Sequence, residues 1–177
     1  MTATLRETSA LSAGPSSRDA ANRSDETQLV TFKLGAEEYG IDIMQVQEII
    51  RLPDIVRVPK APPFVEGVIN LRHKILPVID LARRFGTSSE QRTDASRIVV
   101  VNVRDNPVGL IVDSVCEVIR LSTGTVEPLP DVVANVDSRF LYGIGRLNDR
   151  LVLLVELAKV FSSDEVRQLE SVEGSSV

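Results

Sequence analysis

One pattern of apolar and polar positions occurs twice along the chain. Residues 64–85 read as an apolar strand that opens on glycine, a polar tip, a second apolar strand and a short helix that ends in phenylalanine. Residues 140–161 repeat this order at a constant offset of 76 positions, with identical residues at both ends. Self-similarity at a fixed offset is the signature of a repeated structural unit. The pattern therefore predicts two copies of a hairpin followed by a short helix.

A second pair of matching stretches lies upstream of these hairpins. Residues 30–52 align without gaps on residues 99–121, at an offset of 69 positions. The difference between the two offsets is an insertion of seven residues in the second half. The chain is thus a tandem duplication of one β-rich unit. Each half supplies about five strands, which is enough to close a small barrel, so we predict a mainly β fold of two small barrels packed together, with short helices.

Changes in composition divide the chain into segments. Residues 1–27 are rich in Ser, Thr, Ala and Asn and hold few large apolar residues, which predicts a disordered tail. Order is expected over 28–163, with the polar, turn-prone stretch 86–96 as the boundary between the halves. Residues 164–177 are expected to form a C-terminal helix and tail. Within the first hairpin, Pro77 cannot donate to a ladder, so its strand is predicted to be an edge strand or to carry a bulge.

Charge and cysteine content narrow the possible functions. The formal net charge of −5 argues against a phosphate-binding surface, because nucleic-acid affinity rests on clustered Lys and Arg. Residues 51–92 carry a balance of +4 and residues 93–137 a balance of −4, which favours oriented docking with a partner. The single cysteine excludes an internal disulfide and fits a reducing compartment. No apolar run approaches the ~20 residues of a membrane span, and we expect a cytoplasmic protein.

The inventory of reactive side chains is poor. With one histidine, His73, and one cysteine, Cys116, neither a catalytic triad nor a zinc site of usual composition can be assembled. Cys116 lies in an apolar run and is predicted to be a small core residue. His73 lies at the tip of the first hairpin, where a positive φ is often required and is tolerated by His.

Four carboxylates stand at strand ends, where a paired acid–base site is conceivable. These are Asp42, Asp80, Asp113 and Glu156. Capping of the following short helices is the simpler interpretation, at least for Asp80 and Glu156. No phosphate-binding glycine loop is present, and aromatic residues make up only 4% of the chain. The sequence therefore predicts no enzyme.

Four motifs in order resemble the CheW family, the adaptors that couple chemoreceptors to the histidine kinase CheA. They are FKLGAEEYGIDIMQVQEII, GVINLRHKILPVIDL, VGLIVDSVCEVI and YGIGRLNDRLVLLVEL, and the resemblance covers about residues 28–161. It implies two intertwined five-stranded SH3-like β-barrels, no enzymatic activity and no cofactor or metal. The implied partners are the cytoplasmic tip helices of methyl-accepting chemoreceptors, the regulatory domain of CheA and other CheW copies in array rings. The resemblance also implies that the protein neither binds nucleic acid nor inserts directly into the membrane. It would instead be recruited to membrane-associated receptor arrays.

The family's receptor-binding groove lies between the two barrels. Matched position by position, it would use Val46, Glu48, Arg72, Ile98, Val99, Gly109, Val115 and Val118. The apolar residues would receive a receptor helix while Arg72 and Glu48 set its register, as in helix-in-groove recognition. The segment 122–132 resembles a kinase-contact loop of the family in position only.

One position departs from the family pattern. The family usually has Gly after NLR, where this chain has His73, which adds bulk beside Arg72 and could change receptor preference. Two alternatives stay open at this point. One is a tandem β-barrel nucleic-acid-binding protein, and the other is a coupling protein of a non-swimming chemosensory pathway such as twitching or surface behaviour.

Overall fold

The fold consists of two curled β-sheets. The structure is a computed structural model and describes residues 26–86, 92–129 and 138–174. The first sheet, here called barrel A, has the order β8-β1-β2-β11-β10-β9. Its strands are β1 (Glu26–Leu34), β2 (Glu37–Asp42), β8 (Ser114–Ser122), β9 (Val126–Glu127), β10 (Leu141–Leu147) and β11 (Arg150–Val155). The second sheet, barrel B, has the order β3-β6-β7-β5-β4. Its strands are β3 (Val46–Arg51), β4 (Gly67–Leu71), β5 (Lys74–Asp80), β6 (Arg97–Val103) and β7 (Asn106–Val112).

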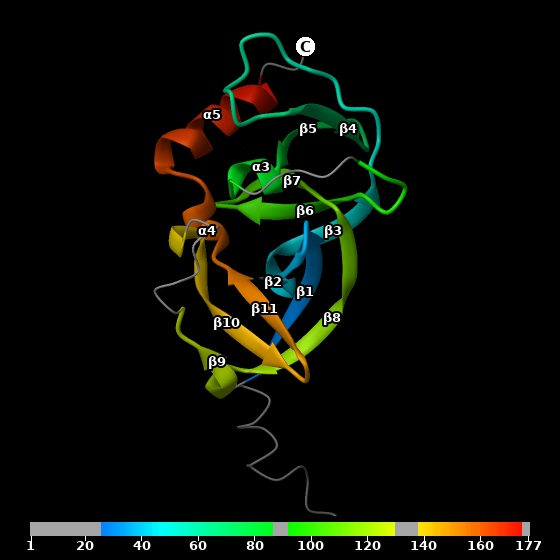
Figure 1. Ribbon diagram of the computed structural model, residues 1–177. Helices are drawn as coiled ribbons and strands as arrows, with labels where there is room; N and C mark the ends of the chain where they lie inside the picture. The colour runs from blue at the N-terminus through cyan, green and yellow to red at the C-terminus, as the bar shows by residue number, and fades with distance from the viewer. Residues whose placement is uncertain (1–25, 87–91, 130–137, 175–177) are drawn as a thin grey trace, which may run out of the picture.

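Each barrel contains strands from both halves of the sequence. The hairpin β1–β2 belongs to the first half but pairs with β8 and β11 of the second. The hairpin β6–β7 opens the second half but pairs with β3 and β5 of the first. The two junctions are equivalent, since β2–β11 and β5–β7 are both parallel pairs. Figure 1 shows barrel A below and barrel B above it, and the expected mainly β fold of intertwined barrels is confirmed.

The core lies mainly between the barrels. Strand β6 illustrates this, because Val99, Val101 and Val103 point into the large central cluster. Ile98 and Val100, on the opposite face of the same strand, fill a smaller cluster within barrel B. A strand that is buried on both faces has no exposed polar side to maintain. This is why the run RIVVVNV is almost uninterrupted by polar residues.

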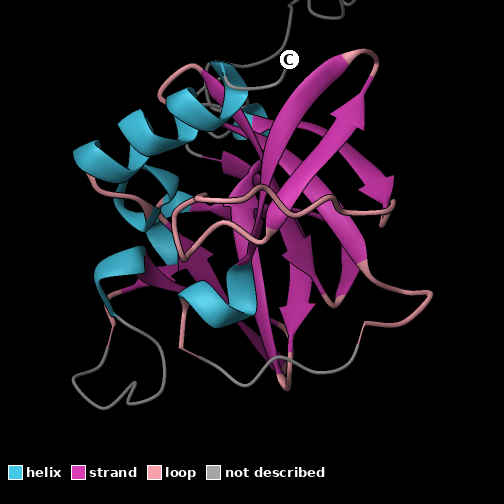
Figure 2. Ribbon diagram, turned by 90° about the horizontal axis from the view of Figure 1, so that it is seen from above, coloured by secondary structure: helices cyan, strands magenta, loops and turns pink. Residues whose placement is uncertain are grey.

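The helices are short, apart from the last one. They comprise α3 (Leu81–Arg84), α4 (Leu157–Val160) and α5 (Ser163–Gly174), with the single 3-10 turns η1 (Ile43–Gln45), η2 (Thr123–Thr125) and η3 (Ser138–Phe140). Figure 2 shows most of the helical segments gathered on one side of the strands. The Asp80 side chain accepts from Arg83 N and caps α3, and Asp42 caps η1 in the same way. The predicted cap by Glu156 is wrong, because its side chain makes no hydrogen bond at the start of α4.

Two segment boundaries differ from the sequence-based expectation. Strand β1 begins at Glu26, inside the predicted tail 1–27, because Glu26 and Thr27 pair with Ser122 and Leu121 of β8. The remainder of that tail, residues 1–25, lies outside the described residues, as do 87–91 within the predicted boundary between the halves and 175–177 at the end. Helix α5 begins at Ser163, one residue before the predicted start of the C-terminal segment.

Pro77 does not mark an edge strand. Its strand β5 lies between β7 and β4, and its pairing with β4 shows no register shift. The proline is tolerated because the pairing between β5 and β7 begins only at Val78. The edges of barrel B are β3 and β4, and the outer edge of β4 is bridged by Val56, whose N–H and C=O both bond to Val68.

Candidate functional site

An exposed ion pair joins the two edges of barrel B. Glu48 lies on β3, and Arg72 lies at the tip between β4 and β5. Arg72 Nη1 is 3.2 Å from Glu48 Oε2, and its Nη2 is 3.5 Å from Oε1, so two nitrogens face two oxygens. The Arg72 side chain is 79% exposed and that of Glu48 25% exposed. The fold thus brings together the two charged residues of the candidate site and leaves the arginine open to solvent.

The backbone of the tip fixes where Arg72 points. Arg72 has φ 52° and His73 φ 67°, which is the left-handed conformation required at both central residues of a type I′ hairpin turn. The Oδ1 of Asn70 accepts a hydrogen bond from His73 N at 3.1 Å and stabilises the turn. The prediction that His73 occupies a position of positive φ is confirmed.

The other candidate residues differ in how deeply their side chains are buried. Val118 is 54% exposed, whereas Val46 and Val115 are partly buried and pack against the central core. The side chains of Ile98 and Val99 are fully buried. These two residues can shape the sheet behind the site but cannot contact a partner while the strands keep this arrangement.

Gly109 also lies in the interior. A Cβ atom there would come within 2.9 Å of Ile98 Cγ2, so the position requires the absence of a side chain for strands to pack. Its part in the site is therefore to allow close packing, and a direct contact with a partner is not supported by its burial.

Two exposed apolar residues beside Glu48 were missed by sequence reasoning. Met44 in η1 is 86% exposed, and Ile49 on β3 is 39% exposed. Ile49 and Arg51 lie on one exposed face of β3, and the register shift between Val46 and Glu48 interrupts the alternation before them. An isoleucine two positions from an arginine on a strand face is the signal that could have identified it.

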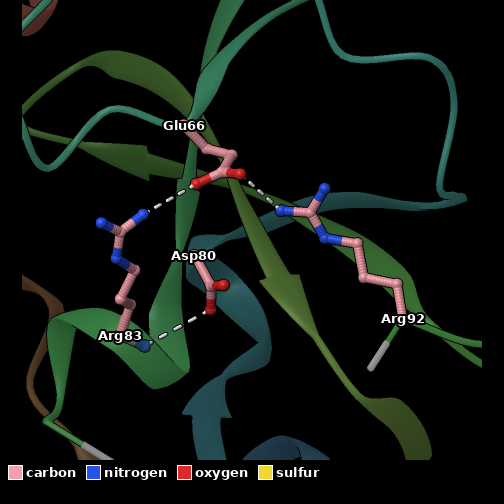
Figure 3. Close-up of polar contacts among 4 residues, drawn as sticks. All are labelled: Glu66, Asp80, Arg83 and Arg92. Atoms are coloured by element: carbon pink, nitrogen blue, oxygen red, sulfur yellow. Dashed lines mark hydrogen bonds and ion pairs between the residues drawn. The ribbon is translucent and has the colours of Figure 1, made fainter. Parts of the chain in front are cut away.

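A second charged group holds barrel B together at the far end of β4. Figure 3 shows the Glu66 carboxylate between Arg83 and Arg92. The ion-pair distances are 3.4 Å to Arg83 Nη1 and 2.9 Å to Arg92 Nη2. Arg83 also carries the N–H that Asp80 caps at 3.4 Å. Glu66 is 15% exposed and both of its oxygens are engaged. This group ties α3 to the start of β4 and has a structural role.

Cys116 is not the core residue that its neighbours in sequence suggested. It lies on β8 and is exposed. Partial burial raises the pKa of the Cys116 thiol, and the nearby negative charge of Glu38 raises it further. A raised pKa keeps the thiol protonated at neutral pH, which is the opposite of what a nucleophile needs.

The described part of the chain offers little for other chemistries. No group of three or more His, Cys, Asp or Glu residues is placed there to hold a metal ion. Within the same residues, no helix is long and apolar enough to cross a membrane. Of the segment 122–132, the described part forms the end of β8, η2 and β9, and residues 130–132 lie outside the described residues.

Two barrels built by exchange between two copies of one unit define the class of twin SH3-like barrel proteins. The comparisons identify the family within that class. The family model of the CheW-like domain matches residues 28–165, and the chain belongs to the CheW family, a family of scaffold proteins.

Individual relatives agree with this assignment. The chemotaxis protein CheW of Treponema pallidum is 36% identical over 84% of this chain and 89% of its own length. The chemotaxis protein CheW of Klebsiella aerogenes is 35% identical over 82% of this chain and 87% of its own length. The crystal structure of the scaffolding protein TtCheW from Thermoanaerobacter tengcongensis superimposes with a TM-score of 0.72 at 39% identity, covering 78% of this chain and 90% of that one.

Proposed function

We propose that this protein is a non-enzymatic adaptor that couples methyl-accepting chemoreceptors to the histidine kinase CheA. The observation that carries the proposal is the family match over residues 28–165, which spans both barrels. By holding receptor and kinase in a fixed geometry, the adaptor would let the state of the receptor control phosphotransfer. We expect it in the cytoplasm, recruited to receptor arrays in which further copies take part. The pathway that it serves, swimming or otherwise, is left open.

The receptor would contact the surface that carries Glu48 and Arg72. Arg72 is mostly exposed, and its planar guanidinium can bind a carboxylate with two parallel hydrogen bonds. Val118, on β8 of barrel A, is exposed and would supply an apolar contact, and Val46 and Val115 are partly buried against the central core. A receptor helix would place its apolar face on the valines and its acidic residues on Arg72, which is the division of roles in helix-in-groove recognition.

The proposal is tested by reversing one charge. Arg72→Glu is expected to lower the affinity for a receptor cytoplasmic fragment at least tenfold, about 1.4 kcal/mol, because two carboxylates would then face the receptor. Binding to the CheA regulatory domain and the thermal unfolding temperature should change little, since the side chain is 79% exposed. Affinities for both partners can be measured by titration calorimetry.

Arg146→Glu is the matched control. Arg146 is also an exposed arginine paired with a glutamate, Glu127 at 3.4 Å, but it lies in barrel A. Its reversal should leave receptor binding unchanged. The double variant Glu48→Arg with Arg72→Glu restores an ion pair with the opposite orientation. If receptor affinity is unchanged in Arg72→Glu, or is equally reduced in Arg146→Glu, the receptor does not use this surface.

A further inference from the structure

A pocket of about 690 Å³ opens on barrel A, on strands that carry none of the Glu48–Arg72 pair. It is lined by polar residues from three strands, Glu38 of β2, Cys116 of β8 and Arg150 of β11, and by apolar residues that include Leu151 and Leu153 of β11. Leu151 is 52% exposed. The pocket therefore combines an apolar wall with a small number of polar groups, as ligand-binding sites do.

Glu38 is the unusual member of this pocket. The residue is only 9% exposed, and its Oε2 is 3.3 Å from Arg150 Nε. Its Oε1 is buried and has no hydrogen-bond partner among the described residues. An unsatisfied buried acceptor costs about 1–3 kcal/mol, and more when it is charged. Apart from Arg150, the donor that the fold places at this carboxylate is the weak thiol of Cys116.

The duplicated unit shows that the fold does not need this carboxylate. At the offset of 69 positions, the counterpart of Glu38 in barrel B is Pro107. Two neighbouring positions in barrel B hold Gln47 and Asn102, the counterparts of Cys116 and Lys33, and these are hydrogen-bonded to each other at 2.6 Å. The same place in the unit can thus be built with every polar group satisfied. A role in packing does not account for Glu38.

We propose that this pocket binds an arginine side chain of a partner protein, whose guanidinium donates to Glu38 Oε1 while its methylene stem packs on Leu151. The unpaired Oε1 can accept a hydrogen bond from a strong donor, and an arginine carries its fork of donors on an apolar stem. The terminal torsion of a glutamate is broad, so the carboxylate can turn Oε1 toward the pocket. The lining holds two carboxylates, Glu37 and Glu38, and two cations, Lys33 and Arg150, so the attraction for a guanidinium rests on Glu38 Oε1 and not on net charge. The pocket shares strand β8 with Val115 and Val118 of the receptor surface proposed above, but its lining includes neither of them.

Cys116 provides a built-in reporter. It is the single cysteine of the chain, it lines the pocket and it is exposed. Occupancy of the pocket should therefore slow its alkylation by N-ethylmaleimide, which is uncharged. The probe is N-acetyl-arginine methylamide, and N-acetyl-norleucine methylamide serves as the control with an apolar stem and no cation. Saturating arginine probe is expected to slow alkylation of the wild-type protein at least threefold, and the norleucine probe is not.

Three variants decide the outcome. Glu38→Gln removes the charge with little change of shape and should weaken protection by the arginine probe at least fivefold. Leu151→Ser removes the exposed wall and should weaken it about threefold, in a position where folding is not at risk. Glu117→Gln, an exposed partner of Arg150 outside the pocket lining, should retain protection. The proposal is overturned if neither probe protects Cys116, if both protect equally, or if Glu38→Gln is protected as well as the wild type.

Discussion

The two barrels are copies of one unit, yet their equivalent charged residues have different surroundings. Glu48 in barrel B corresponds to Glu117 in barrel A, and each pairs with an arginine at the hairpin tip of its own barrel. Arg72 is 79% exposed, and among the residues that the structure describes it forms an ion pair with Glu48 alone. Arg150 is 43% exposed and bridges Glu117 to the buried Glu38. One copy presents its arginine to solvent, while the other uses it to compensate a buried charge.

The difference in exposure gives the two arginines different roles: Arg72 is available to bind a partner, whereas Arg150 stabilises the fold. An exposed ion pair contributes roughly 0–1 kcal/mol to folding, so Arg72 can change partners at little cost to the fold. Removing one member of a buried pair is costly, because the other charge stays in a low-dielectric environment without compensation. We therefore expect substitution of the arginine that pairs with Glu48 and of the arginine that pairs with Glu117 to have unequal effects.

The largest effect is expected at position 84, where the first copy has Arg and the second has Val160. Arg84 Nε donates to Val160 O at 3.0 Å, and Arg84 also pairs with Glu165 of α5. Its guanidinium lies 5.4–5.7 Å from the ring centres of Phe64, Phe140 and Phe161. Arg84→Met keeps the apolar stem but removes these interactions, and we expect a loss of about 3 kcal/mol in the free energy of unfolding, measured in urea.

The pH dependence of the free energy of unfolding isolates the contribution of Glu165, the ion-pair partner of Arg84. Burial acts to raise the pKa of Glu165, but the hydrogen bonds and charge from Arg84 and the bonds from Ser162 outweigh it and lower the pKa. A lowered pKa stabilises the fold above the ordinary pKa of glutamate, about 4.3, and this contribution is lost as the pH falls through the folded-state pKa. The difference in stability between wild type and Glu165→Gln should accordingly be full at pH 7 and vanish toward pH 3. A difference that does not depend on pH would show that the carboxylate charge contributes nothing.

An intermediate effect is expected from the two tip arginines themselves. Arg150→Gln should lower the free energy of unfolding by about 2 kcal/mol, because Glu38 is left buried without its cation. Arg72→Gln should change it by less than about 0.5 kcal/mol, since both partners of that pair reach solvent. Urea denaturation of the two variants side by side tests the contrast. Equal losses would mean that the burial of Glu38 has no energetic consequence.

The duplication made most of the fold predictable from sequence, but the exchange of hairpins was beyond it. Internal repeats show that two similar units exist. They do not show whether the hairpin β1–β2 pairs within its own half, because either pairing buries the same apolar residues. Only the resemblance to a known family implied intertwined barrels. The parallel junctions β2–β11 and β5–β7 are where the structure departs from two separate halves.

Burial along single strands was the least predictable feature. Cys116 was expected in the core, but the pairing of β1 with β8 shifts register between Thr31 and Phe32. Such a shift interrupts the alternation of faces, and Cys116, Glu117 and Val118 are consecutively exposed. Short-range apolar patterns cannot reveal an irregularity that depends on the partner strand.

The candidate site was predictable only in part, for the same physical reason. Charged residues such as Glu48 and Arg72 must remain near the surface, so their accessibility follows from their chemistry. Ile98 and Val99 lie in an apolar run that reads the same for an exposed groove wall and for a central strand. Because β6 is covered on both faces, the structure places both in the interior.

A small effect of the opposite sign is expected at the turn that presents Arg72. His73 holds φ 67°, which strains any residue with a Cβ, whereas Gly adopts it freely. His73→Gly should therefore stabilise the protein by about 0.5–1 kcal/mol, which raises the unfolding temperature by roughly 2–4 °C per kcal/mol. At the equivalent tip of barrel A, Asn148 has φ 51°, and Asn tolerates this region well. Asn148→Gly should thus gain less than His73→Gly in the same thermal melt. If His73→Gly instead lowers the unfolding temperature, the imidazole makes a favourable contact at the tip that outweighs its backbone strain, and its place beside Arg72 would then have to be explained by that contact.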